Sequence, residues 1–375
     1  MKFENVKFIF GGLIGNNAYD VEVNGDVISA ITPACKKENC NYVTLPYIDV
    51  HTHGGAGHDV SELTKEALDA IGDYLLYNGI GAYLPTFVAT PLGKLDEMFL
   101  KLRNLSPSGA EILGAHIEGP YISLAKKGAQ PAANILTAYD PKDAVFFEKN
   151  KDILKIVTLC PATKNAPLLV KTLVGNGIKA EAGHDDSVDT EIIECMKNGL
   201  DGATHIYCAS SGFRRLKGSI EKHLGLNECA LLFDEIYTEV IADGVHISEN
   251  LFDFIYKNKG YRKIILVSDS LAPAGAPCGK YLLGDDTPVI TDGTAAYLED
   301  KSALAGSVTN VAKTVENVVS YGVPLAHAVY AATETPRKYL SLPYDALSCG
   351  STASFNVLDE KGKLLHVVNR GRTVR

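Results

Sequence analysis

The sequence predicts an α/β protein: a (β/α)8 TIM-like barrel with a small β-sandwich domain built from both chain termini. Three observations lead to this prediction. Short β-rich runs recur with helix-like stretches between them, hairpin-like segments occupy both ends of the chain, and histidine or acidic residues stand where the runs end. We place the small β domain at residues 1-47 and 344-375 and the barrel at residues 48-343.

The small β domain is predicted from alternating segments near both termini. Residues 7–14, 19–31 and 41–46 alternate apolar and polar side chains between Gly-Gly and Asn-Gly turn signals, so we expect β-hairpins there. Similar material returns at 353–371, where Asp-Glu-Lys-Gly is typical of a hairpin turn. We therefore expect the two termini to share one domain.

The barrel is predicted from eight short β-rich runs. They are 45–51, 81–87, 111–118, 153–159, 178–184, 202–207, 238–246 and 263–269. Stretches with helical spacing, such as 63–79, separate them. A doubly wound sheet is the alternative, but the polar residues end many strands instead of gathering at one switch point. After the eighth run, 279–300 alternates like a hairpin pair and 303–322 returns to helical spacing.

Composition restricts the partners and the compartment. With 375 residues, of which 46% are hydrophobic, the chain can build a large core. A formal net charge of -9 argues against a nucleic-acid surface, although a local basic pocket could still hold an anionic small molecule. The eight cysteines form no CxxC pair, which favours a reducing, cytoplasmic location. No run approaches the ~20 apolar residues of a membrane span.

Six histidine and acidic residues fall where the predicted strands end. They are His51, His53, Glu118, His184, His205 and Asp269. A parallel barrel finishes all its strands on one face, so it would bring these groups together. Taken singly, each residue could cap a loop or sit in a solvated turn. Their joint occurrence predicts a divalent metal centre with acid/base chemistry.

Spacing supports this interpretation. His51 and His53 are one residue apart, so their side chains point to the same side of a strand and can bind one ion. The carboxylate of Glu118 offers an oxygen ligand at ~2.0 to 2.2 Å from a zinc-like ion. His116 lies two positions before Glu118 and is interpreted as a core or supporting group. Other histidines lack support from a strand end: His58, His223 and His327.

A series of motifs makes the resemblance specific. In chain order they are HTHGGAG, HIEGPYIS, KKGAQP, AGHDDS, THIY, IADGVHIS, LVSDSLAPAG and LAGS. Together they resemble the N-acetylglucosamine-6-phosphate deacetylase family of the amidohydrolase superfamily, and the match continues to TPRKYLSL at 335–342. HxH alone would indicate only the superfamily, whereas HIEGP, IADGVH and the segment around APAG narrow it.

The resemblance implies particular roles. It places the metal ligands on Glu118, His184 and His205, and the catalytic acid/base on Asp269. The HxH pair can hold a second ion in some members, so one or two ions per chain are expected. Zinc is the first expectation, and iron, manganese or cobalt also suit these ligands. The resemblance also puts His246 in the substrate pocket and Gln130 near the acyl group, although Gln130 could instead cap the loop 126–134.

The implied reaction is hydrolysis of the acetamide of N-acetylglucosamine 6-phosphate to glucosamine 6-phosphate and acetate. A divalent ion lowers the pKa of bound water from ~15.7 toward ~7 and polarises the carbonyl. Asp269 would take the water's proton and then deliver it to the leaving amine. The alternative for Asp269 is an N-cap or turn residue.

The segment 208–218 is the candidate phosphate site. Its polar and basic side chains are Ser210, Ser211, Arg214, Arg215 and Lys217. Arginine suits bidentate phosphate contact, but the basic run could equally be the solvated start of a helix. The resemblance also implies substrate contacts at Cys208 and Ala209, where the family has an Asn-Ala pair whose amide and backbone help hold the sugar phosphate. The chain has Ala162 where a Glu is usual. The sugar and its phosphate are therefore left open.

Two further functions compete. One is deacetylation of an epimer, N-acetylgalactosamine 6-phosphate, or of another N-acyl compound. The other is a barrel that serves as a non-catalytic scaffold, which would be expected to lack some of the ligands. Because relatives are often dimers in which a neighbouring chain completes the phosphate site, the resemblance also implies a homodimer.

Overall fold

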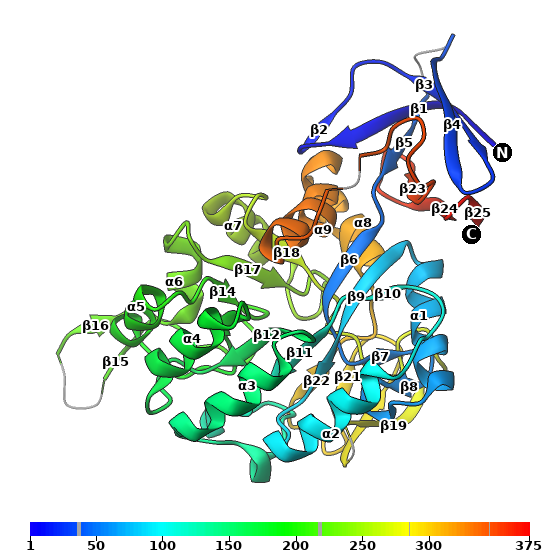
Figure 1. The fold of residues 1–375 in the computed structure, drawn as a ribbon. Coiled ribbons are helices and arrows are strands. Elements are labelled where there is room, and N and C mark those ends of the chain that lie inside the picture. The colour runs from blue at the N-terminus through cyan, green and yellow to red at the C-terminus, as the bar shows by residue number, and fades with distance from the viewer. Residues whose placement is uncertain (36–38, 217–219, 285, 345) are drawn as a thin grey trace.

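The computed structural model describes residues 1–35, 39–216, 220–284, 286–344 and 346–375. Its centre is a parallel barrel (Figure 1), and all eight predicted runs contribute a strand. In ladder order these are β6 (Tyr47–Thr52), β9 (Ile80–Phe87), β11 (Ala115–Glu118), β12 (Leu154–Leu159), β13 (Lys179–Ala182), β14 (Gly202–Ala203), β17 (Tyr237–Val240) and β18 (Ile264–Leu266). The short β10 (Glu111–Ile112) also pairs with β9.

The first and last barrel strands meet in what we call the seam. It is formed by a parallel bridge between Thr52 and Ser270 and a hydrogen bond from the Asp269 backbone N–H to His51 O at 2.9 Å. These contacts lie at the C-terminal ends of β6 and β18. The seam therefore joins the two strands at the residues that the sequence selected as functional.

A buried carboxylate reinforces the seam from within. Asp49 on β6 accepts hydrogen bonds from Ser268 Oγ at 2.5 Å and from the Ser268 backbone N–H at 3.2 Å. Complete burial raises the pKa of Asp49 to about 7 in spite of these bonds. The Asp49–Ser268 hydrogen bonds thus help to hold β6 against the end of β18, where other neighbouring barrel strands are held by a longer backbone ladder.

Helices surround the barrel. They are α1 (Lys65–Tyr77), α2 (Leu92–Arg103), α3 (Ala144–Asn150), α4 (Ala166–Gly175), α5 (Asp189–Lys197), α6 (Leu226–Leu232), α7 (Glu249–Lys259), α8 (Val311–Ser320) and α9 (Leu325–Tyr339). In α1, Thr64 caps the first turn by accepting from the Ala67 N–H, and Leu68, Ile71 and Leu75 bury one stripe. No helix in the described ranges combines the length and apolarity of a transmembrane span.

Strands from both termini form one sheet at the end of the barrel where the strands begin (Figure 1). These strands are β1 (Lys2–Phe10), β2 (Leu13–Ile14), β3 (Tyr19–Asn24), β4 (Val27–Pro33), β5 (Asn41–Thr44), β23 (Phe355–Leu358), β24 (Leu364–Asn369) and β25 (Arg372–Thr373). The β1/β2, β3/β4 and β23/β24 hairpins are confirmed. A bridge between Val27 and Thr352 shows that this sheet curves back on itself, while two separate sandwich layers stay a prediction.

The segment 41–46 differs from its prediction as a hairpin arm. Its strand β5 runs parallel to β1 and antiparallel to β23, so neither neighbour is joined to it by a tight turn. The reason is topological: β5 lies between the N-terminal and C-terminal strands and then leads directly into β6. Periodicity of two shows a strand but does not show the direction of its partner.

A four-stranded antiparallel sheet, here called the cover sheet, lies toward the other end of the barrel (Figure 1). It comprises β19 (Gly279–Leu283), β20 (Thr287–Thr291), β21 (Ala296–Leu298) and β22 (Leu304–Gly306). The hairpin pair predicted within 279–300 is present. The stretch 303–322 is helical only from Val311, because Leu304–Gly306 pairs with β21 and Asn310 caps the helix by accepting from the Lys313 N–H.

Short elements complete the chain. The strands β7 (Gly54–Gly55) and β8 (His58–Asp59) form a hairpin directly after β6, and β15 (Arg214–Arg215) and β16 (Lys222–His223) form an arm that projects from the barrel (Figure 1). Single 3-10 turns are η1 (Val60–Glu62), η2 (Leu124–Lys126), η3 (Ala132–Asn134) and η4 (Pro141–Asp143).

Candidate metal centre

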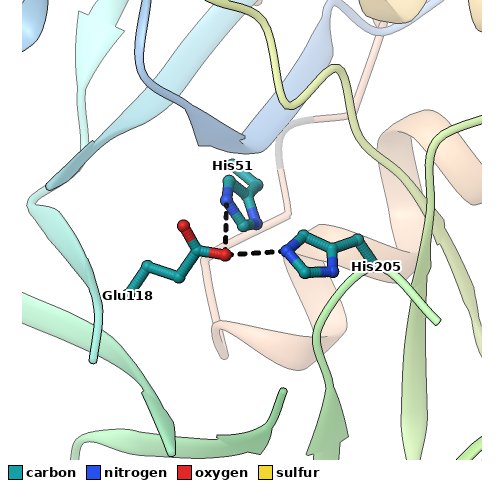
Figure 2. A group of neighbouring side chains, drawn as sticks. All are labelled: His51, Glu118 and His205. Carbon is teal, nitrogen blue, oxygen red and sulfur yellow. Dashed lines mark hydrogen bonds and ion pairs between the residues drawn. The ribbon is translucent and has the colours of Figure 1, made fainter. Parts of the chain in front are cut away.

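Glu118 is the point at which the predicted ligands meet. Its Oε1 lies 2.8 Å from His184 Nε2 and 2.7 Å from His205 Nε2. Figure 2 shows that His51 on β6 also turns toward this oxygen, with its Nε2 at 3.8 Å. These residues come from β11, from the ends of β13 and β14, and from β6, so the barrel unites them as the sequence predicts.

A second group adjoins the first. Asp269 Oδ1 lies 3.2 Å from His53 Nε2 and 3.5 Å from His51 Nε2. His53 Nε2 is also 3.4 Å from Glu118 Oε2. Among the described residues, three sets have ligand atoms close enough to share an ion: His51, Glu118 and His205; His51, His53 and Asp269; and His51, His116 and Glu239. His51 belongs to all three, and the first two adjoin the cavity through Glu118, His205, His53 and Asp269.

Backbone geometry turns several of these side chains into the centre. His184, His205 and Asp269 have φ values of 43°, 25° and 48°, in the left-handed region that L-residues seldom adopt. Such a conformation costs about 1–3 kcal/mol per residue and persists only where the surrounding structure imposes it. All three residues directly follow or lie near the end of a barrel strand, where this backbone turn aims the side chain across the barrel mouth.

The hydrogen bonds on the far sides of the imidazoles show that a cation fits here. His184 Nδ1 faces the Lys126 carbonyl at 2.8 Å, and His53 Nδ1 faces the Thr86 carbonyl at 2.9 Å. Carbonyl oxygens only accept, so both Nδ1 atoms carry hydrogen and the Nε2 atoms of neutral rings present lone pairs to the carboxylates. Lone pairs that face each other repel, so a proton or a metal ion has to lie between the Nε2 atoms and the carboxylate oxygens.

Distances favour the metal ion. His and carboxylate ligands bind zinc-like ions at about 2.0–2.2 Å, which sets neighbouring ligand atoms roughly 3 Å apart. The contacts around Glu118 span 2.7 to 3.8 Å. Within the described residues, His51 Nε2 is buried without a hydrogen-bond partner, as expected of a ligand atom. The donor set therefore fits a divalent ion.

The charges in the centre show a demand for cations. Burial alone would raise the pKa of Glu118, but the facing His184 and His51 hold it well below its usual range. Burial would lower the pKa of His53, yet hydrogen bonds to Asp269 and Glu118 raise it to about 9. The pKa of Asp269 is also lowered, because His53 and its neighbours outweigh the effect of burial. Both carboxylates are therefore anionic and demand positive charge.

Gln130 lies directly against the centre. Its Nε2 donates to Glu118 Oε2 at 2.5 Å, and its Oε1 accepts from the Ala89 N–H at 2.7 Å. The side chain is therefore fixed at both ends and only 4% of the residue is exposed. The Ala89 contact ties the loop 126–134 to the chain just after β9, and the bond to Glu118 ties the amide to the metal centre.

A cavity of about 410 Å³ opens over the centre. Four predicted substrate-contact residues line it: Gln130, Cys208, Ala209 and His246. His246 is oriented by Asp243, whose Oδ2 lies 2.7 Å from His246 Nδ1. Leu283 and Leu304 of the cover sheet supply an apolar wall. A larger hollow of about 1470 Å³ lies between the strand beginnings and the terminal sheet, but no described residue lining it is a histidine.

The predicted arginines lie elsewhere. Arg214 pairs with the carboxylate and the backbone carbonyl of Asp186, and Arg215 lies exposed on the projecting arm. Neither belongs to the described residues that line the cavity. Ser210 donates to Asn227 Oδ1 and Ser211 to Asp185 Oδ2, so both serve loop structure. Lys217 lies outside the described residues.

Sequence reasoning missed two neighbours of the centre. Glu239 on β17 lies 2.9 Å through Oε2 from His51 Nδ1, and Lys126 lines the cavity. An acidic residue within the otherwise apolar strand was the available signal for Glu239. His116 has the predicted core role: its ring nitrogens face Val50 O and Thr158 Oγ1, and burial holds its pKa well below the usual range.

Comparison with known proteins agrees with this architecture. The chain belongs to the amidohydrolase family, whose model matches residues 42–374. It is 32% identical over 311 residues to the N-acetylglucosamine-6-phosphate deacetylase of Bacillus subtilis (strain 168), covering 78% of this chain and 75% of the relative. The resemblance to the deacetylase family that the motifs indicate is thereby confirmed.

Other relatives match over nearly the full chain. The solved N-acetylglucosamine-6-phosphate deacetylase of Thermotoga maritima has a TM-score of 0.85 at 28% identity, covering 100% of this chain and 99% of that one. The N-acetylgalactosamine-6-phosphate deacetylase of Escherichia coli O157:H7 is 26% identical and covers 91% of this chain and 90% of its own. A Mycobacterium smegmatis deacetylase, 22% identical with a TM-score of 0.86 over 99% of both chains, shares the fold.

Proposed function

We propose that this chain hydrolyses the acetamide of N-acetylglucosamine 6-phosphate, releasing acetate and glucosamine 6-phosphate. The observation that carries the proposal is the meeting of His184 and His205 at Glu118, with Asp269 beside them, under a cavity of about 410 Å³. The relatives named above act on such sugars, and the Mycobacterium smegmatis protein was solved in complex with N-acetyl-D-glucosamine-6-phosphate.

The proposed metal ligands are Glu118, His184 and His205, with His51 and His53 available for a second ion. A bound divalent ion would polarise the acetamide carbonyl and lower the pKa of water. Nitrogen and carboxylate donors suit zinc first, with iron, manganese or cobalt as alternatives. One ion or two is settled by elemental analysis of the purified protein.

Asp269 is the proposed general base and acid. Its carboxylate is ionised, since His53 and neighbouring imidazoles lower its pKa, so it can accept the proton of the attacking water. It can then deliver that proton to the nitrogen as the C–N bond breaks. Gln130 keeps one N–H beyond its bond to Glu118, which can donate to the carbonyl oxygen of the substrate.

Cys208, Ala209 and His246 are the proposed contacts to the sugar, since they line the cavity. Arg214 and Arg215 stay proposed phosphate contacts, but each would have to move to reach the phosphate. Arg214 would have to exchange Asp186 for phosphate, and Arg215 would have to reach the ligand from the projecting arm. Variants with each arginine changed to methionine, compared on phosphorylated and unphosphorylated substrates, test these roles.

We also propose a cytoplasmic homodimer with a small β domain at 1-47 and 344-375 and a barrel at 48-343. The cysteines form no disulfide among the described residues, which suits a reducing compartment. The projecting arm exposes Phe213 and Ile220, at 55% and 89%, and such apolar surface suits burial against another chain. Light scattering of the purified protein tests the dimer.

The second candidate function is deacetylation of N-acetylgalactosamine 6-phosphate, favoured by the Escherichia coli relative that covers 91% of this chain. Acetate release from both phosphorylated epimers and their unphosphorylated forms, before and after chelation, separates the candidates. Preference for the glucosamine epimer with loss on chelation is the expected result. Purified protein that acquires no metal and releases no acetate would instead favour the scaffold hypothesis.

A further inference from the structure

Glu239 places a buried carboxylate behind His51, on the side away from the cavity. It is the third residue of β17, and its Oε2 lies 2.9 Å from His51 Nδ1. His51 is 0% exposed and Glu239 is 1% exposed, so no bulk water screens the contact. The pair reaches across the barrel interior, from the first predicted strand to the seventh.

This contact determines which nitrogen of His51 is free. A carboxylate oxygen accepts hydrogen bonds, and Glu239 Oε2 also faces the His205 backbone N–H at 3.3 Å. Nδ1 of His51 is therefore the donor, and Nε2 keeps its lone pair. That lone pair points toward Glu118 Oε1 at 3.8 Å and Asp269 Oδ1 at 3.5 Å, which a ring without a cation in front of it would not favour.

Packing alone does not explain why a carboxylate is buried at Glu239. Its second oxygen, Oε1, is buried without a hydrogen-bond partner among the described residues. A buried carboxylate left half satisfied costs free energy, so a residue kept only for packing would be expected to bond through both oxygens. The neighbouring buried Glu181 differs: it accepts from Thr204 Oγ1 at 2.9 Å and has no described hydrogen bond to a centre imidazole.

We infer that Glu239 is a positioning residue: it fixes the His51 ring with Nε2 toward the metal centre and so strengthens ion binding at His51. The inference rests on the proposed function, because it presupposes a metal ion. A carboxylate behind a ligating histidine orients the ring and increases its basicity, and loss of such a partner weakens metal affinity by ~10–100-fold. Glu239 is not among the described residues that line the cavity, and it contacts the His51 ring on the Nδ1 side, away from Nε2.

The experiment measures metal binding directly. Metal-free wild-type protein and Glu239→Gln are titrated with Zn²⁺ against a competing chelator, and bound ions per chain are counted by elemental analysis. We expect ~10–100-fold weaker binding of one ion in the variant. Glu181→Gln is the comparison variant, since Glu181 is a buried carboxylate of the same barrel interior without a described hydrogen bond to a centre imidazole, and its zinc affinity should fall far less than that of Glu239→Gln.

Thermal unfolding separates positioning from a structural role. Without metal, Glu239→Gln should have a Tm at or slightly below that of wild type, because the Gln amide oxygen can still accept the His51 Nδ1–H bond but the buried contact loses its carboxylate. With zinc, its Tm should rise less than that of wild type, since ligand stabilisation follows affinity. A metal-free Tm well below that of wild type, with an unchanged rise on adding zinc, would make Glu239 a structural residue and overturn the inference.

A double-mutant cycle closes the test. If Glu239 acts through His51, then Glu239→Gln should cause no further loss of zinc affinity in a His51→Gln background. Additive losses would contradict the inference. Wild-type protein that binds none of zinc, iron, manganese and cobalt would refute the proposed function first, whereas wild-type binding with an unaffected Glu239→Gln variant would refute this inference alone.

Discussion

Gln130 and Glu118 are joined by a 2.5 Å hydrogen bond in which the amide Nε2 donates to Oε2, so a neutral side chain orients the carboxylate at the middle of the metal centre. Gln130→Ala should reduce turnover by roughly 10–100-fold and weaken metal affinity, because Glu118 loses its restraint. Steady-state kinetics and zinc titration measure the two effects. Ala89 donates its backbone N–H to Gln130 Oε1, a bond that does not depend on the Ala89 side chain, so Ala89→Ser serves as a control with near-normal affinity.

Asp269→Asn should keep the ion held by Glu118, His184 and His205 but lose turnover by ~10²- to 10⁴-fold, since an amide cannot accept and return a proton. The change preserves the size of the side chain that lies 3.2 Å from His53. Acetate release and elemental analysis of the same sample check both halves of the statement. Near-normal turnover by a fully metal-loaded variant would refute the acid/base role.

Removal of the ion should abolish acetate release and lower the Tm. His53 and Glu118 then face each other without a metal, and protons only partly replace its charge. Binding to the folded state alone stabilises it in proportion to RT ln(1 + [L]/Kd), so the Tm should rise with added zinc concentration. Chelation, dialysis and calorimetry at increasing zinc test this. A Tm independent of metal would contradict a folded-state site.

Lys259 predicts a pH dependence of stability away from the site. It is 7% exposed in the last turn of α7, its Nζ donates to Phe233 O at 2.6 Å, and burial lowers its pKa from 10.5 to about 8. Between those values the unfolded chain binds a proton that the folded chain has released. Stability from this group is therefore full above 10.5 and is lost as the pH falls through about 8.

Lys259→Met should remove that dependence, worth at most roughly 3 kcal/mol, and raise the Tm at pH 7. The measurement is the Tm of both proteins from pH 7 to pH 10. The matched control is Lys257→Met, two residues earlier in α7, whose side chain is 68% exposed and pairs with Asp253 at the surface. Parallel curves for wild type and Lys259→Met would contradict the lowered pKa.

The barrel and its ligands were predictable because their signals are local. Each of Glu118, His184 and His205 stands where a short apolar run stops, and a parallel barrel is the arrangement that finishes such runs on one face. Direction of pairing is not local, which is why β5 was expected in a hairpin and lies parallel to β1 instead.

The arginines show where nearness in sequence stops being informative. Arg214 follows His205 by nine residues, yet the chain leaves the barrel in the β15/β16 arm and Asp186 binds the guanidinium. Glu239 shows the opposite case. Whether a mid-strand acid faces the barrel interior depends on the stagger of all the strands, so its contact with His51 could not be read from the strand alone.

The place where the barrel closes has a consequence for quality control of the enzyme. The Asp269 backbone N–H donates to His51 O and so joins the eighth strand to the first. The proposed proton-transfer group is therefore in place only when the two ends of a nearly 220-residue stretch have paired. If the two strands separate, Asp269 loses its position beside His53, so we expect such a chain to be inactive and its exposed backbone to be cut more readily by proteases. Enzymatic activity should therefore indicate that the barrel has closed at the seam.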